Sequence, residues 1–126
     1  MLRWLGHDNA AVLDGGWEAW VKADAPVTAD LPAVKASTFT GRPRDVSVDV
    51  GYVLSHLNAP GMLVIDARAP ERFRGEAEPL DPVAGHIPGA TNRPAAQNLN
   101  ADGTFKPSAT LRAEFAALVG VRSLAT

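Results

Sequence analysis

Hydrophobic residues in the first part of the chain change from a continuous run to helical spacing. Residues 10–14 form a short apolar run, which predicts a buried strand. Trp17, Trp20 and Val21 then fall at i, i+3 and i+4 after a glycine pair, so we expect a short helix whose tryptophans pack in a core. Residues 2–6 end in glycine and are typical of the last turns of another helix. A strand, a glycine turn and a helix together make half of a βαβ unit.

Residues 27–46 lack any such periodicity. Pro32 and Pro43 punctuate a polar stretch, and proline fixes φ and disfavours helix in the residue before it. This composition predicts an extended connector. We therefore expect a domain boundary within it.

Helical spacing returns after the connector. Residues 50–57 place four apolar side chains at i, i+3, i+4 and i+7, and Ser47 or Asp49 can cap the helix that this spacing predicts. Residues 62–65 are continuously apolar, as expected of a strand covered on both faces in a parallel sheet. Residues 66–68 follow at the C-terminal end of this strand, where ligands gather in open α/β sheets.

A loop rich in charge, proline and glycine is expected over residues 69–91. The Asp-Gly pair at 102–103 predicts a tight turn. Residues 107–108 can open a final helix, with apolar positions on one face of residues 111–119 and Gly120 at its end. The order of strands and helices predicts the α/β class.

Composition narrows the function classes. The net charge is −2 and the basic residues are scattered, which argues against a nucleic-acid groove or a membrane surface as partner. No apolar run is long enough to span a bilayer or to serve as a secretory signal, so we expect a cytoplasmic location. The three histidines lie far apart, and we expect neither a metal site nor a cofactor.

The sequence contains no cysteine. It therefore offers no disulfide, no thiolate metal ligand and no cysteine nucleophile.

Several short motifs carry a family resemblance. In the second half they are residues 64–68, 71–76, 85–90, 92, 98–99, 102–103 and 105–106. In this order and spacing they resemble the opening of the C-terminal domain of the tandem rhodaneses, the thiosulfate and 3-mercaptopyruvate sulfurtransferases. Residues 4–7 and 12–17 resemble the end of that family's N-terminal domain.

This resemblance implies a rhodanese-like parallel-sheet fold of the α/β class, present only as partial domains. Residues 1–26 would be the C-terminal end of a first rhodanese-like domain. Residues 27–46 would be the inter-domain connector, and residues 47–126 the N-terminal part of a second domain. The chain is thus expected to be a fragment of a tandem-domain protein.

The family moves sulfur from thiosulfate or 3-mercaptopyruvate to cyanide or a thiol through a low-pKa cysteine thiolate. By resemblance that cysteine should lie just beyond Gly120, yet residues 121–126 contain none. We therefore assign no catalytic residue, expect the chain to be inactive alone, and leave open whether it is an enzyme. The alternatives are a non-catalytic rhodanese-like interaction or structural module and a homo-oligomer formed through exposed strand edges.

Arg72 is the one binding residue that the resemblance assigns. In the family this arginine helps to bind the small anionic sulfur donor, a task that suits the planar guanidinium fork. The alternative is an ion pair with Glu71, Glu76 or Glu78. Residues 78–81 depart from the mercaptopyruvate-type pattern, which has a second arginine in this region, and this departure favours thiosulfate or an unspecified donor.

Three nearby residues are expected to be structural. Asp66 and Arg68 could look catalytic at a strand end, but we expect them to organise the loops. His86 could act as a general base, but we expect it to hold the backbone through a hydrogen bond. Glu76, Glu78 and Asp81 form an acidic stretch that Pro79 and Pro82 should keep in an exposed loop, without the spacing of a calcium site.

Overall fold

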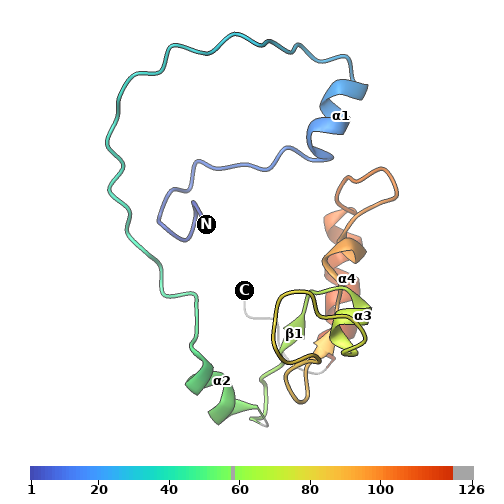
Figure 1. Ribbon diagram of the computed structural model, residues 1–126. Helices are drawn as coiled ribbons and strands as arrows, with labels where there is room; N and C mark the ends of the chain where they lie inside the picture. The colour runs from blue at the N-terminus through green and yellow to red at the C-terminus, as the bar shows by residue number, and fades with distance from the viewer. Residues whose placement is uncertain (58, 121–126) are drawn as a thin grey trace. The chain divides into compact units, whose positions relative to one another are not determined.

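The computed structural model describes residues 1–57 and 59–120, which form two compact units. The first unit is Met1–Val48 and the second is Asp49–Thr126 (Figure 1). Residues 121–126, where the resemblance places the start of the cysteine loop, lie outside the described part of the chain.

The first unit begins with a hydrogen-bonded turn where the end of a helix was expected, and no helix is found before Gly16. The amide of His7 donates to the carbonyl of Leu2 at 3.0 Å, and that of Gly6 donates to Arg3 at 3.1 Å. With Gly6 at φ 86°, these two bonds form a Schellman motif. Helix α1 (Gly16–Lys22) follows, as its apolar spacing predicts.

The strand expected at residues 10–14 is wrong. No strand occurs in the described residues of the first unit, and Val12 is 78% exposed. A buried strand needs a neighbour for its backbone N–H and C=O groups, and this unit supplies none. The core position expected for Trp17 is also wrong, because its side chain is exposed. Trp20 is half-buried, and its indole N–H donates to the carbonyl of Pro26 at 3.1 Å.

The connector carries no helix or strand across residues 27–46. Its last part returns to the start of the chain. The amides of Arg42 and Arg44 donate to the carbonyls of Leu5 and Trp4, each at 2.8 Å. The Arg44 guanidinium also pairs with Asp8 at 2.6 Å. These bonds hold the two ends of the first unit together.

The second unit opens with helix α2 (Val50–His56). Asp49, rather than Ser47, caps it, since an Asp49 carboxylate oxygen accepts the Tyr52 amide at 2.7 Å. The predicted helix is therefore confirmed, although Val50 and Leu54 on its apolar face stay exposed to solvent.

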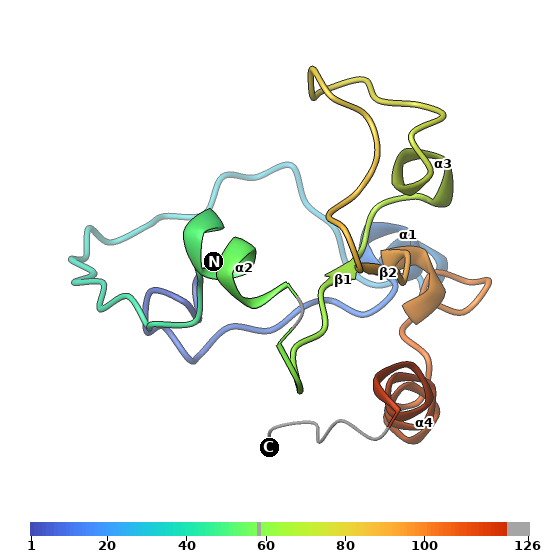
Figure 2. The same ribbon diagram turned by 90° about the horizontal axis from the view of Figure 1, so that it is seen from below.

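A parallel pair of strands lies at the centre of this unit. Strand β1 (Ile65–Asp66) pairs with β2 (Thr91–Asn92), with Ile65 opposite Thr91 and Asp66 opposite Asn92. The amides of Thr91 and Arg93 donate to the carbonyls of Val64 and Asp66, each at 2.9 Å. The predicted parallel sheet is confirmed, but β1 begins only at Ile65, the last residue of the apolar run. The expected cover on both faces is wrong at Ile65, which is 37% exposed. Figure 2 shows α3 (Pro70–Phe73) and α4 (Ser108–Val119) on opposite sides of the two strands.

The remaining elements follow β2. A 3-10 helix (Ala95–Asn98) leads to a bridge between Leu99 and Phe105, and Gly103 turns the chain there at φ 82°. This is the tight turn that the sequence predicts. Helix α4 then presents the predicted apolar face, with Val119 buried and Leu111, Phe115 and Leu118 half-buried. Among the described residues, no helix is long and apolar enough to span a bilayer.

Candidate functional site

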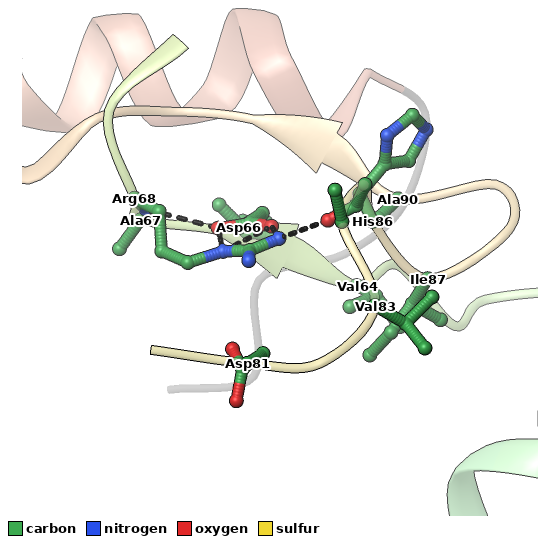
Figure 3. A pocket seen from close by; sticks show the side chains of 12 residues that line it. Val64, Asp66, Ala67, Arg68, Asp81, Val83, His86, Ile87 and Ala90 are labelled. Carbon is green, nitrogen blue, oxygen red and sulfur yellow. Dashed lines mark hydrogen bonds and ion pairs between the residues drawn. The ribbon is translucent and has the colours of Figure 1, made fainter. Parts of the chain in front are cut away.

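The C-terminal end of β1 holds a tight arginine–carboxylate pair. The Arg68 side chain folds back onto Asp66, with Nη2 donating to Oδ2 at 2.6 Å and Nε to Oδ1 at 3.0 Å (Figure 3). The Arg68 amide also donates to Asp66 Oδ1 at 2.9 Å. These hydrogen bonds from Arg68 lower the pKa of the Asp66 carboxyl. Arg68 Nη2 reaches the carbonyl of Gly85 at 2.7 Å, so the pair ties β1 to the loop before β2.

Glu78 joins two arginines. Its Oε1 accepts Arg72 Nη2 at 2.6 Å, and its Oε2 accepts Arg68 Nη1 at 3.3 Å. Oε1 also accepts the backbone amides of Leu80 and Asp81, both at 3.1 Å. The Glu78 side chain is only 5% exposed, so the exposed loop expected for the acidic stretch is wrong at this residue. The hydrogen bond from Arg72 is the main cause of its lowered pKa.

Arg72 lies on α3, and only some of its guanidinium N–H groups have acceptors. Its side chain is 22% exposed and pairs with Glu78, while Asp81 Oδ2 lies 3.5 Å from Nη2. Of the three candidate ion-pair partners, Glu78 is the one found. Arg72 Nε is buried and has no hydrogen-bond partner among the described residues. Arg72 therefore has an N–H group left to donate to a ligand, whereas Nε, Nη1 and Nη2 of Arg68 all donate to protein acceptors. Its role toward a sulfur donor stays a prediction.

An open hollow of about 570 Å³ lies beside this charged cluster. Its walls come from β1 and from the loop that precedes β2 (Figure 3). Asp66, Arg68 and Asp81 supply charged groups, and apolar residues such as Val83 and Ile87 supply most of the remainder. Arg72 does not belong to the lining, and its guanidinium pairs with Glu78 and Asp81 instead.

His86 has the structural contact expected of it. Its Nδ1 lies 2.7 Å from the carbonyl of Phe73, and the two rings stack with centroids 3.7 Å apart. Since a carbonyl oxygen accepts and does not donate, Nδ1 carries the proton. His86 thus fastens the loop before β2 to α3.

A second charged cluster was not anticipated from the sequence. Arg93 follows β2 and pairs with Glu114 of α4, and its guanidinium lies 5.0 Å from the centre of the Phe115 ring. Lys106 reaches the same carboxylate at 2.9 Å. These bonds lower the pKa of Glu114. The cluster anchors α4 to the end of the sheet, and the spacing of its members along the sequence gives no hint of it.

The charge balance limits what the first cluster can bind. Arg68 and Arg72 face the three carboxylates of Asp66, Glu78 and Asp81. An anion that approaches Arg72 must therefore replace a carboxylate or use the donors that remain.

Comparison with known proteins gives the family. No family model matches the chain. A protein of Pseudomonas aeruginosa named "Probable 3-mercaptopyruvate sulfurtransferase" is 42% identical over 121 residues, which cover 94% of this chain and 43% of the relative. The rat 3-mercaptopyruvate sulfurtransferase is 32% identical over 84% of this chain and 37% of its own length. The chain belongs to the rhodanese-type sulfurtransferase family.

Another relative carries the name of a different role. A protein of Thermus thermophilus named "Sulfur carrier protein TtuD" is 35% identical over 124 residues, or 88% of this chain and 43% of that protein. This chain thus spans less than half the length of these three relatives. A solved structure of an EanB variant with ergothioneine superposes with a TM-score of 0.76 at 21% identity, over 95% of this chain and 31% of EanB. This likeness confirms the rhodanese-like α/β fold.

Proposed function

We propose that this chain forms the donor-binding side of a thiosulfate or 3-mercaptopyruvate sulfurtransferase with tandem rhodanese-like domains. In this assignment the first domain ends with residues 1–26, and the second begins with residues 47–126. The connector between the two domains is residues 27–46. Two of the relatives carry the name of a 3-mercaptopyruvate sulfurtransferase, which supports the reaction class. We also propose a cytoplasmic location, which fractionation of the source cells would test.

The observation that carries this proposal is the state of Arg72. Its guanidinium shares the Glu78 carboxylate with Arg68, at the C-terminal end of β1. Its Nε is buried and has no partner in the described residues. A buried guanidinium N–H that lacks an acceptor is costly, so an incoming oxyanion gains a hydrogen bond that nothing else supplies. In the whole protein, Arg72 would hold the anionic group of the sulfur donor.

The sulfur-transfer step itself requires a thiol. A cysteine thiolate attacks the outer sulfur of thiosulfate, the sulfur–sulfur bond breaks, and sulfite leaves with the bonding electron pair. Cyanide then attacks the outer sulfur of the persulfide and releases the thiolate. This chain has no cysteine, so it cannot form the persulfide by itself.

A cyanolysis assay tests the proposal. We expect the purified 126-residue chain to form thiocyanate from thiosulfate and cyanide no faster than buffer. A protein extended by the coding sequence that follows Thr126 should form thiocyanate, and replacing its first downstream cysteine by serine should abolish the activity. If the extended reading frame has no cysteine after Gly120, the assignment as a sulfurtransferase is wrong.

A non-catalytic module is the second candidate. The lack of cysteine favours it, as do the exposed apolar side chains on α1 and α2, such as Trp17 and Leu54. These faces and the open edges of the short sheet could also pair two copies of the chain. The intact mass of the native protein tests the module, and light scattering tests self-association. A stable product of 13.3 kDa supports the module, and a stable dimer supports self-association.

A further inference from the structure

The carboxylate of Glu78 sits among hydrogen-bond donors from three parts of the second unit. Arg72 Nη2 donates from α3 at 2.6 Å and Arg68 Nη1 from the end of β1 at 3.3 Å. The amides of Leu80 and Asp81 donate from the following turn, each at 3.1 Å. Two guanidinium groups and two adjacent backbone N–H groups are the donors that proteins use to bind oxyanions.

We propose that this is an oxyanion site which the chain fills with its own Glu78, and that an external oxyanion binds there by displacing this carboxylate. The inference rests on the proposed role of Arg72 and adds the group that competes for it. Glu78 is thus an autoinhibitory ligand, and its departure opens the site.

Burial and geometry support an internal ligand over an ordinary surface ion pair. The Glu78 side chain is 5% exposed, whereas Glu76, two residues earlier, pairs with Arg74 in the open, with both side chains more than half exposed. One oxygen of Glu78 accepts three N–H groups, which is the coordination that a bound oxyanion would receive. Arg72 Nε adds a buried donor that Glu78 does not use.

Asp81 completes the site from its rim. Its Oδ2 lies 3.5 Å from Arg72 Nη2, and its side chain is 61% exposed. Asp81 therefore repels an incoming anion without filling the site. The three carboxylates thus differ in their place: Glu78 lies inside the site, Asp81 lies at its rim, and Glu76 lies outside it.

The test measures the affinity of the 126-residue chain for thiosulfate by NMR titration. Chloride balances the added anion so that the ionic strength stays constant. The reporters are the amides of Leu80 and Asp81 and the Nε–H of Arg72. We expect Glu78→Gln to bind thiosulfate about tenfold more tightly than the parent chain, because a charge-assisted hydrogen bond no longer competes. Asp81→Asn should gain about twofold from reduced repulsion. The matched control Glu76→Gln should not change the affinity.

Two further variants separate this inference from the role of Arg72. Arg72→Gln tests that role alone, and adding Arg72→Gln to Glu78→Gln should remove the gained affinity. If Arg72→Gln weakens binding but Glu78→Gln does not strengthen it, Arg72 binds the donor and the internal-ligand inference is wrong. If Arg72→Gln has no effect in either background, the proposed donor role fails as well. Should Glu78→Gln not fold, the parent chain decides: if the Leu80 and Asp81 amide signals do not shift at saturating thiosulfate, Glu78 keeps its place and the inference is wrong.

Discussion

Replacing Asp66 by asparagine should loosen the junction between β1 and β2. The Asp66 carboxylate is 12% exposed and accepts the Arg68 side chain through Nε and Nη2, at 3.0 and 2.6 Å. Asparagine keeps one acceptor but turns an amide N–H₂ toward a guanidinium, so donor faces donor. The loss of these charge-assisted hydrogen bonds should lower the free energy of unfolding by about 2 kcal/mol. This is toward the lower end of the usual range, because Arg68 remains partly solvated and keeps its hydrogen bond to the Gly85 carbonyl.

Native-state hydrogen exchange measures this cost at the sheet itself. The Arg93 amide donates to the Asp66 carbonyl, and its exchange reports opening of the pair of strands. A loss of about 2 kcal/mol should speed its exchange about 30-fold. Glu76→Gln is the control, because its exposed pair with Arg74 should change the rate by no more than about twofold. Unchanged Arg93 exchange in Asp66→Asn would refute the view that this ion pair holds the sheet end.

Three further outcomes concern the second unit. The carboxyls of Asp66 and Glu78 have pKa values below the ordinary 3.8 and 4.5. Their stabilisation is therefore complete only above these ordinary values, from about pH 5, and is lost as pH falls through the lower native values. Circular dichroism between pH 6 and 2 should show the loss, and Asp66→Asn should show less of it. Gly75→Ala should destabilise the unit more than Gly103→Ala, because both have positive φ but only at Gly75 would a Cβ meet a backbone amide, at 3.2 Å; thermal melts compare them. Nitrogen-15 NMR at pH 8 should find the proton of His86 on Nδ1, and an Nε2-protonated ring would contradict its bond to the α3 carbonyl.

Local signals in the sequence predicted most of the helices. Asp49 is followed by apolar spacing over α2, and Gly120 ends α4, because capping and helical periodicity act within a few residues. Strands depend on distant neighbours. The run at residues 10–14 has the composition of a buried strand, but without a partner it stays irregular and exposed. The short α3 lies in a segment rich in charge and proline, where four residues are too few to show a period.

The candidate site was only partly predictable. Family motifs pointed to Arg72, and chemistry reduced its partners to three acidic residues. The choice of Glu78 depends on how the turn after it closes, since the amides of Leu80 and Asp81 help to hold that carboxylate. Arg93 could not be paired with Glu114 in advance, because the connection between them includes a turn and the start of α4.

The three hydrogen bonds to Glu78 Oε1 couple the charge of the site to the path of the backbone. The same oxygen neutralises a guanidinium and fixes the direction of the chain at Leu80 and Asp81. Any side chain placed at this position therefore sets both the local charge and the outline of the adjoining surface. The size of the neighbouring hollow can be changed elsewhere, for example at Val83 on its wall, a side chain that makes no hydrogen bond to Glu78.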